Sequence, residues 1–340
     1  MTGGAGFVGN RVLGELLARG HAVVNADALT DAASLSAVWS LEEDPGYTLE
    51  PADICDGEGM ARLFQRHRPD AVLHLAADQG TGTSTLELRQ AMEVNAMGTL
   101  TLLEAARQHW ERSDRPEGFR FLHASSADVL ASLGERGQAG EGAAHAPATP
   151  HGASKAAGDH LVSAWWQSFG LPTLTCRSGQ SFGPWQHPTA LIPLTLMRAL
   201  RGEPIPVAGQ GGQARDWLPV EDHARGLVDV LERGHVGETY NISAGFEMRE
   251  IDLVRALCRL LQVRRPSPTP YGGLVTFGPS AMGVPFRQAL DGTKLRGELG
   301  WRPERSFEDA LGDTIDWYLA HHGWWHASAP LAADRQEAVA

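Results

Sequence analysis

Thr2-Gly3-Gly4-Ala5-Gly6-Phe7-Val8-Gly9 is the stretch that decides the fold we expect for this chain. Its glycines at positions 3, 6 and 9 lead into an amphipathic run with helical spacing, Val12 to Leu17. Glycines at this spacing let the backbone turn tightly and approach a pyrophosphate, which then lies at the N-terminus of the following helix. Because glycine-rich turns are common, the triplet needs a second signal before it predicts a site.

Asp27 supplies that second signal. It ends the β-like run from His21 to Ala26 and follows Gly9 by eighteen residues, a spacing that lets a carboxylate hydrogen-bond an adenosine ribose. Together the two features predict a dinucleotide site. A carboxylate here repels a 2′-phosphate, so we expect NAD rather than NADP, although Arg11 favours the opposite choice. Since such a loop normally follows a buried strand, we also expect the protein to start upstream of Met1.

Strand and helix signals alternate through the first half of the chain. We expect a short strand ending at Ala52–Ile54, a buried strand at 70–77, one long helix over 86–109 and a further strand at 119–124. This alternation predicts an α/β fold, a doubly wound parallel sheet covered on both faces, with ligands at the carboxyl ends of the strands.

The pattern loosens after Cys176, and helices near 190–201, 249–262 and 306–321 alternate with shorter strands. We therefore expect a cofactor-binding domain over 1–180, completed by about 220–242, and a smaller substrate-binding domain. The smaller domain would comprise residues 181–219 and 243–326, with a disordered tail at 327–340.

Bulk composition excludes several classes of protein. Charged residues make up 21% and apolar residues 42% of the 340 positions, as in ordinary globular proteins, and the net charge of −12 disfavours a nucleic-acid surface. No apolar run is long enough for a membrane span, and no signal peptide opens the chain. Three scattered cysteines and the lack of ligand-spaced motifs predict a cytoplasmic protein without a metal site.

His151 and Lys155 form the central candidate constellation. Pro150 and the apolar-periodic run that follows it predict a helix start, so these two side chains, four positions apart, share one helix face. Lys155 is one of only two lysines in the chain. Arginine replaces lysine readily on a surface but poorly where a compact ammonium must fit a pocket.

At this point the chain resembles the extended short-chain dehydrogenase/reductases, and most closely the dTDP-glucose 4,6-dehydratases. The resemblance runs from Thr2 to about Trp325 and implies a Rossmann-type fold that binds NAD. The stretches that carry it are Thr2–Gly9, Ala52-Asp-Ile-Cys-Asp56, Ser154-Lys-Ala-Ala-Gly-Asp-His160, Arg215-Asp-Trp-Leu218, Glu221-Asp-His-Ala-Arg225 and Gly237-Glu-Thr-Tyr-Asn-Ile242.

The resemblance also implies roles for single residues. Ser126 would hold the sugar hydroxyl, and Lys155 would bind the nicotinamide ribose. Arg215, Asn241 and Arg287 would lie at the diphosphate of a nucleotide-diphosphate sugar. The cofactor would contact Gly3, Gly6, Phe7, Val8, Gly9, Asp27, Asp53, Ile54, Leu75, Ala77, Asn95 and Lys155.

Three departures from the family pattern affect the expected chemistry. His151 stands where the family has the tyrosine base of Tyr-x-x-x-Lys, and it is either a working base or a helix-start residue without a role. Ala127 replaces the acid that protonates the leaving hydroxyl, and Asp128 replaces a glutamate base; Asp128 could instead cap its loop. The substrate contacts also differ, at 79–83, Thr189-Ala190, Val284 and Gln288.

These features predict an NAD-dependent nucleotide-sugar enzyme that acts through transient oxidation at C4 and is 4,6-dehydratase-like. The alternatives are an epimerase without water loss and a non-catalytic NAD- or nucleotide-sugar-binding homologue. For Arg215, an ion pair with Asp216 or Asp222 remains an alternative to phosphate binding. The resemblance implies a homodimer through the helix after Lys155 and the helix at 86–109; Trp165, Trp166 and Phe169 would supply an apolar face there, and a core role for them is the alternative.

Overall fold

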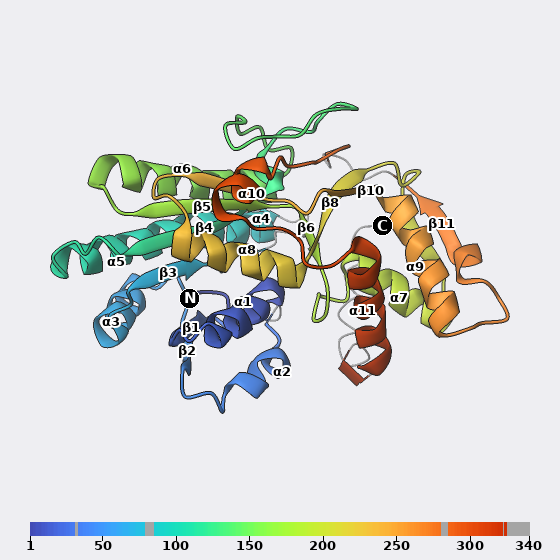
Figure 1. Ribbon diagram of the computed structural model, residues 1–340, viewed down its shortest axis with the longest axis horizontal. Helices are drawn as coiled ribbons and strands as arrows, with labels where there is room; N and C mark the ends of the chain where they lie inside the picture. Colours follow the sequence, from blue (N-terminus) through green and yellow to red (C-terminus); the bar gives the residue numbers. More distant parts are fainter. Residues whose placement is uncertain (31–32, 79–84, 280–284, 322, 325–340) are drawn as a thin grey trace.

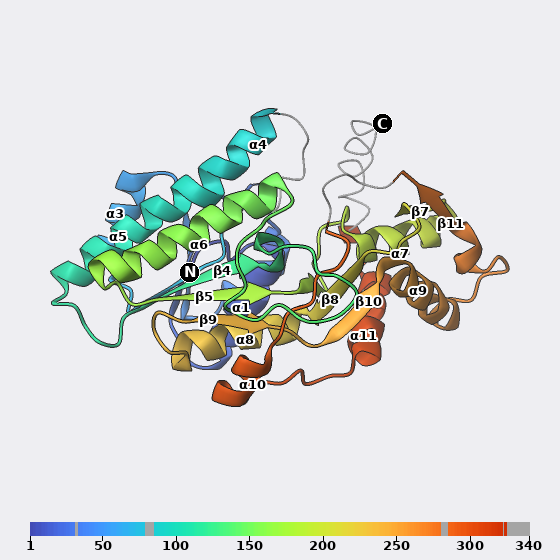
Figure 2. The same ribbon diagram turned by 90° about the horizontal axis from the view of Figure 1, so that it is seen from above.

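The computed structural model describes residues 1–30, 33–78, 85–279, 285–321 and 323–324, and it divides into a large parallel sheet with helices on both faces and a smaller unit beside it (Figures 1 and 2). Predictions made for 79–83, Val284 and 327–340 lie outside the described residues. A search of the described helices finds none with the length and apolar character needed to cross a bilayer.

The large sheet is parallel throughout. Its main part has the order β3-β4-β5-β9, and β1 pairs separately with β2. Thr2 joins the two parts, because it forms bridges to both Ala26 of β1 and His74 of β3. The strands are β1 Val23–Asp27, β2 Tyr47–Pro51, β3 Ala71–His74, β4 Arg120–Ser126, β5 Thr173–Ser178 and β9 Thr239–Ile242. These parallel strands confirm the predicted α/β class.

Helices cover the sheet on both faces, as two separate apolar clusters show (Figure 1). One face carries α1 and α8, which bury residues such as Leu13 and Leu227; the other carries α3, α5 and α6, which bury Phe64, Leu103 and Val162. The bounds are α1 Phe7–Ala18, α2 Leu35–Val38, α3 Gly57–His67, α4 Thr85–Met92, α5 Thr99–Arg112, α6 Pro150–Phe169 and α8 Val220–Arg233.

The smaller unit has its own apolar core around Trp217, Leu257 and Ile315, and lies at one end of the large sheet (Figure 2). Two short sheets build it, β10-β8-β6 and β11-β7. The bounds are β6 Gln180–Phe182, α7 Leu191–Arg201, β7 Ile205–Ala208, β8 Ala214–Pro219, β10 Phe246–Arg249, α9 Glu250–Arg264, β11 Val275–Gly278 and α11 Phe307–Ala320. Helix α10 Thr293–Leu299 packs instead against α8 and β9 of the large sheet.

Two local predictions need correction. The helix expected over 86–109 is broken by a π-helical segment, Glu93–Gly98, between α4 and α5. Its Asn95 side chain bonds to other segments, a geometry that periodicity does not report. The strand expected to end at Ala52–Ile54 ends at Pro51 instead. Beyond it the Asp53 carboxylate accepts a hydrogen bond from Cys55 N and closes a turn.

A buried polar cluster fastens α6 to the sheet. The Asp159 carboxylate lies 3.4 Å from His123 Nε2, 3.3 Å from His145 Nε2 and 3.5 Å from Arg177 Nε. Burial by itself raises the pKa of Asp159, but the His123 and His145 contacts outweigh it and hold the pKa well below its usual range. The carboxylate therefore stays ionised and balances Arg177, which is also buried.

Asp159→Asn should lower the free energy of unfolding by about 3–5 kcal/mol, because it leaves Arg177 buried without its carboxylate. Urea unfolding followed by circular dichroism measures the change. Glu58→Gln is the matched control, since that carboxylate is 91% exposed and should change stability by less than about 0.5 kcal/mol. Equal midpoints for the two variants would show that Asp159 does not fasten α6.

Candidate functional site

The glycine loop forms a backbone cradle at the start of α1. Gly3 has φ +73°, and a Cβ there would lie 2.6 Å from Ala76 N; a Cβ at Gly9 would collide with the Gly3 carbonyl oxygen. Gly6 caps α1 without a side-chain hydrogen bond, and the first turn carries no acidic residue. The cradle and the helix N-terminus therefore fit a pyrophosphate, so the residues present suit a dinucleotide.

Asp27 lies beside this cradle at the carboxyl end of β1. Its carboxylate accepts hydrogen bonds from Ala5 N at 2.9 Å and from Leu29 N at 2.9 Å, which fixes its orientation. A carboxylate has further lone pairs available, so it can also accept ribose hydroxyls. Arg11, the residue that favoured NADP, has its Nε 3.5 Å from a carboxylate oxygen of Glu221.

Lys155 reaches the carboxyl end of β4 from helix α6. Its Nζ donates to Ala124 O at 2.7 Å, and burial lowers the pKa of Lys155 to about 8. Helix α6 begins as the sequence predicts, with Pro150 in its first turn and the Thr149 hydroxyl accepting a bond from Gly152 N. This start sets the position of both His151 and Lys155.

Asn95 locks α6 to the end of β3. Its Nδ2 donates to Ser154 Oγ and to Asp78 O, each at 2.8 Å, and its Oδ1 accepts from Asp78 N at 2.8 Å. Leu75 and Ala77 lie, half-buried, in the segment that follows β3. Of the other predicted cofactor contacts, Phe7 and Val8 begin α1, Ile54 is buried against the π-helical segment, and Asp53 is exposed.

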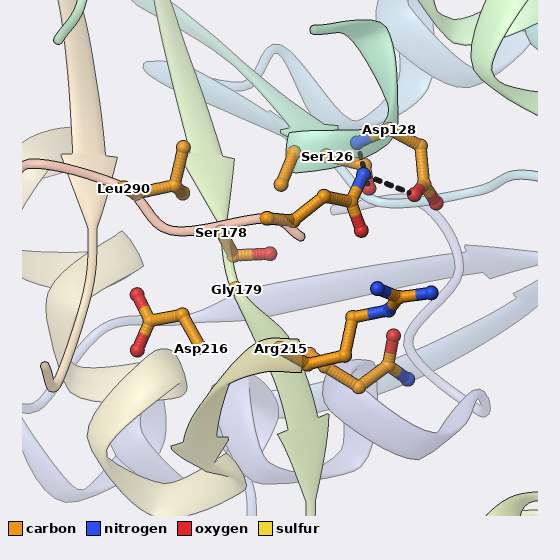
Figure 3. A pocket seen from close by; sticks show the side chains of 10 residues that line it. Ser126, Asp128, Ser178, Gly179, Arg215, Asp216 and Leu290 are labelled. Carbon is orange, nitrogen blue, oxygen red and sulfur yellow. Dashed lines mark hydrogen bonds between the residues drawn. The ribbon is translucent and has the colours of Figure 1, made fainter. Parts of the chain in front are cut away.

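A pocket opens at the carboxyl ends of β4 and β5, facing β8 (Figure 3). The Ser126 hydroxyl accepts a hydrogen bond from Asp128 N and so caps the short 3-10 turn Ala127–Val129. That leaves the Asp128 carboxylate to a different partner, Gln288, whose Nε2 donates to Oδ1 at 2.9 Å. The lining residues are Ser126, Ala127, Asp128, Ser178, Gly179, Gln180, Arg215, Asp216, Gln288 and Leu290.

His151 lies beside Asp128, because Gly152 packs so closely on the Asp128 carbonyl oxygen that a Cβ would collide with it. Burial lowers the pKa of His151; Asp128 raises it and Lys155 lowers it further. Nδ1 of His151 is buried without a hydrogen-bond partner among the described residues. The imidazole is therefore neutral near pH 7, with an unused polar atom.

Arg215, Arg287 and Asn241 differ in their availability to a ligand. Arg215 lines the pocket and donates to Ala214 O and Pro285 O, and burial lowers its pKa. Arg287 is paired with Glu247, with 2.7 Å between Nη2 and Oε2. Asn241 is fully buried and donates to Ala139 O and Asp291 O.

The structure thus brings together Ser126, Asp128, His151, Lys155 and Arg215, and leaves Asn241 in a bracing position away from the pocket lining. Asp222 bonds to Arg225 rather than to Arg215. Sequence reasoning missed Ser178 and Gln180 as pocket residues, whereas Gln288, named from the resemblance as an altered substrate-contact position, does line the pocket. Ser178 has a readable signal, because it ends strand β5.

Gly9→Ala should weaken NAD binding at least about tenfold and lower the melting temperature, because the new Cβ pushes α1 off the Gly3 carbonyl. Gly14→Ala on the same helix is the matched control. Nothing lies within 4 Å of a Cβ there, so it should keep NAD affinity and gain about 0.5–1 kcal/mol of stability. Calorimetric titration with NAD and thermal unfolding measure both; unchanged affinity in Gly9→Ala would contradict the cradle.

Comparison with known proteins agrees with this geometry. The family model described as GDP-mannose 4,6 dehydratase matches residues 1–314. A dTDP-glucose 4,6-dehydratase of Xanthomonas campestris pv. campestris is 43% identical over 328 residues, covering 95% of this chain and 93% of the relative. A dTDP-glucose 4,6-dehydratase of Neisseria meningitidis serogroup B is 42% identical over 333 residues, covering 96% and 94%.

Solved structures give the same result. DesIV, a dTDP-glucose 4,6-dehydratase from Streptomyces venezuelae with NAD bound, superposes with a TM-score of 0.87 at 33% identity, over 96% of this chain and 98% of that one. A Thermus thermophilus UDP-glucose 4-epimerase with NAD gives 0.81 at 29% identity, over 94% and 98%. The predicted Rossmann-type fold, NAD cofactor and family resemblance are confirmed. The chain belongs to the GDP-mannose 4,6-dehydratase family of NAD-dependent nucleotide-sugar epimerases and dehydratases.

Proposed function

We propose that this protein oxidises a nucleotide-diphosphate sugar at C4 and then removes the proton at C5, as a 4,6-dehydratase acting on a dTDP-hexose. The observation that best supports this is one pocket lined by Ser126, Asp128 and Arg215 beside the start of α6, where His151 and Lys155 stand. Arg215 offers the buried guanidinium for the diphosphate, since guanidinium groups suit phosphate oxygens.

In the first step, His151 takes the C4 hydroxyl proton while the Ser126 hydroxyl holds the oxygen. The imidazole is neutral because burial lowers its pKa, so it accepts a proton without prior activation. Lys155 holds the cofactor ribose with donors left over from its bond to Ala124. NAD, when bound, would accept the hydride from C4 and return it to C6 after water has left, while a proton returns to C5, so the overall reaction is loss of water without net oxidation.

In the second step, Asp128 takes the C5 proton, which the C4 carbonyl has acidified. The C5–H bond breaks, and the proton moves to the Asp128 carboxylate. The electron pair of that bond is delocalised onto the C4 carbonyl as an enolate. Loss of the C6 hydroxyl as water then needs one proton, and Asp128 holds it. One carboxylate could therefore serve both transfers, which suits a pocket wall that has Ala127 where the family has an acid.

Ala127 also favours a second function. An epimerase oxidises and reduces C4 without removing water, so it needs no elimination acid, and its chemistry would leave Asp128 without a proton to move. Under this alternative the C4 centre inverts and C5 keeps its hydrogen.

Product analysis separates these functions. The purified holoenzyme is mixed in D₂O with dTDP-glucose and, separately, UDP-glucose, and followed by NMR. A 4-keto-6-deoxy product with deuterium incorporated supports the proposal, and an inverted C4 supports the epimerase. No turnover with NAD bound in the purified protein supports a binding homologue.

The rate of C4 oxidation should rise and fall with pH. His151 must be neutral, and its pKa is lowered, so the rate should fall only below about pH 6.5, the ordinary value for histidine. Lys155 must be charged, and its pKa is about 8, so the rate should fall again above that pH. Single-turnover absorbance of reduced nicotinamide measures both limbs; a rate that keeps rising past pH 9 would exclude a charged Lys155.

His151→Phe should slow C4 oxidation by about 10²–10⁴-fold, because no base remains for the hydroxyl proton. His151→Tyr should restore or exceed the native rate, since a phenol beside Lys155 recreates the family pair. The same single-turnover assay measures both variants. A rate in His151→Phe equal to the native one would show that His151 is not the base.

We further propose a homodimer formed through α5 and α6. Trp166 and Phe169 are 37% and 42% exposed there, and Met97 of the adjoining π-helical segment is 48% exposed. Trp165 packs edge-on against Phe169 and is half-buried.

We also propose that the protein is cytoplasmic. The three cysteines Cys55, Cys176 and Cys258 are free thiols, which suits the reducing cytoplasm.

A further inference from the structure

Residues 286–291 form a strap that crosses between the two parts of the molecule. On one side the strap pairs with β8: Gln288 N donates to Ala214 O at 3.0 Å, and Asp216 N donates to Gln288 O at 3.1 Å. On the other side it pairs with the loop after β4, where Leu133 N donates to Arg287 O at 2.8 Å. The backbone around Gln288 is therefore held from both sides.

Further bonds continue this double attachment along the strap. Ala139 N donates to Ala289 O, Asp291 N donates to Ala139 O, and Ala214 N donates to Phe286 O, each at 2.9 Å. The Ser132 hydroxyl accepts from Phe286 N at 3.0 Å. A side chain on such a fixed segment can hold a partner in one orientation.

The Gln288 side chain is aimed at Asp128. It is 7% exposed, lines the pocket, and donates from Nε2 to Asp128 Oδ1 at 2.9 Å across 160 residues of sequence. Among the described residues, Gln288 is the one side chain that donates a hydrogen bond to the Asp128 carboxylate. One oxygen is thus occupied, and the other remains for the substrate.

We propose that Gln288 is a positioning residue for the C5 proton transfer: its amide fixes the Asp128 carboxylate so that the second oxygen faces the sugar. This inference rests on the proposed function, because it assumes that Asp128 acts at C5. The hydrogen bond from the amide also stops the Asp128 carboxylate from rotating toward His151 or Arg215, the two groups that interact with its charge.

The test separates the two chemical steps in the holoenzyme with dTDP-glucose. Gln288→Leu keeps the volume and removes the donor. C4 oxidation, read from reduced-nicotinamide absorbance in a single turnover, should stay within about twofold of native. Exchange of the C5 hydrogen with D₂O, read by NMR, should slow by about 10–100-fold, a part of the full contribution of a general base.

Rescue distinguishes positioning from a structural role. Gln288→Asn shortens the amide and should slow C5 exchange as Gln288→Leu does. The double variant Asp128→Glu with Gln288→Asn restores the combined length, and should recover most of the exchange rate. Gln262→Leu is the matched control, because that amide donates to Ser267 O outside the pocket and should change neither step.

Each outcome decides one question. If native enzyme and Gln288→Leu oxidise C4 and exchange C5 at equal rates, the positioning role is wrong while the proposed function stands. If the native enzyme oxidises no sugar, the proposed function is wrong. Crystal structures then test the positioning: it requires one Asp128 orientation in the native protein and a turned or split carboxylate in Gln288→Leu.

Discussion

The side-chain amide of Asn95 is the contact on which the arrangement of the site depends. It bonds to both backbone groups of Asp78 at the end of β3 and to Ser154 on α6, so one side chain ties a strand end to two helices. Asn95 lies within the π-helical segment Glu93–Gly98. Helix α6 is then held again one turn beyond Lys155, where Asp159 meets His123 and Arg177. Polar contacts at Ser154 and at Asp159, on either side of Lys155 along the helix, therefore fix the position of Lys155.

Buried ionisable side chains surround the start of α6. Lys155 and Asp159 lie on one helix face, and the carboxylate raises the pKa of the lysine against the larger effect of burial. His151 lies at the edge of the same field, near both Lys155 and Asp128. The site thus holds two groups, His151 and Lys155, whose pKa values burial lowers, as is common where side chains transfer protons.

Local sequence signals predicted the fold and placed polar residues at strand ends, where the structure has a pocket. The glycine loop, Asp27 and the polar residues after β4 each depend on neighbours within a few positions, so spacing and strand ends reveal them. Contacts across long separations could not be predicted. Gln288 donates a hydrogen bond to Asp128 across 160 residues, and Arg287 pairs with Glu247 on β10. The break at Glu93–Gly98 escaped because a π-turn keeps the helical periodicity on either side of it.

The strap over residues 286–291 has a consequence for how this fold can be recombined. It belongs to the second half of the sequence, yet its backbone pairs at once with β8 and with the loop at 132–139. A hybrid that takes its cofactor half from one relative and its sugar half from another must therefore carry both flanks of the strap from the same parent. A junction between them would set side chains from different parents against one another in the pocket, as at Gln288 and Asp128, so sugar preference would change together with catalytic competence rather than apart from it.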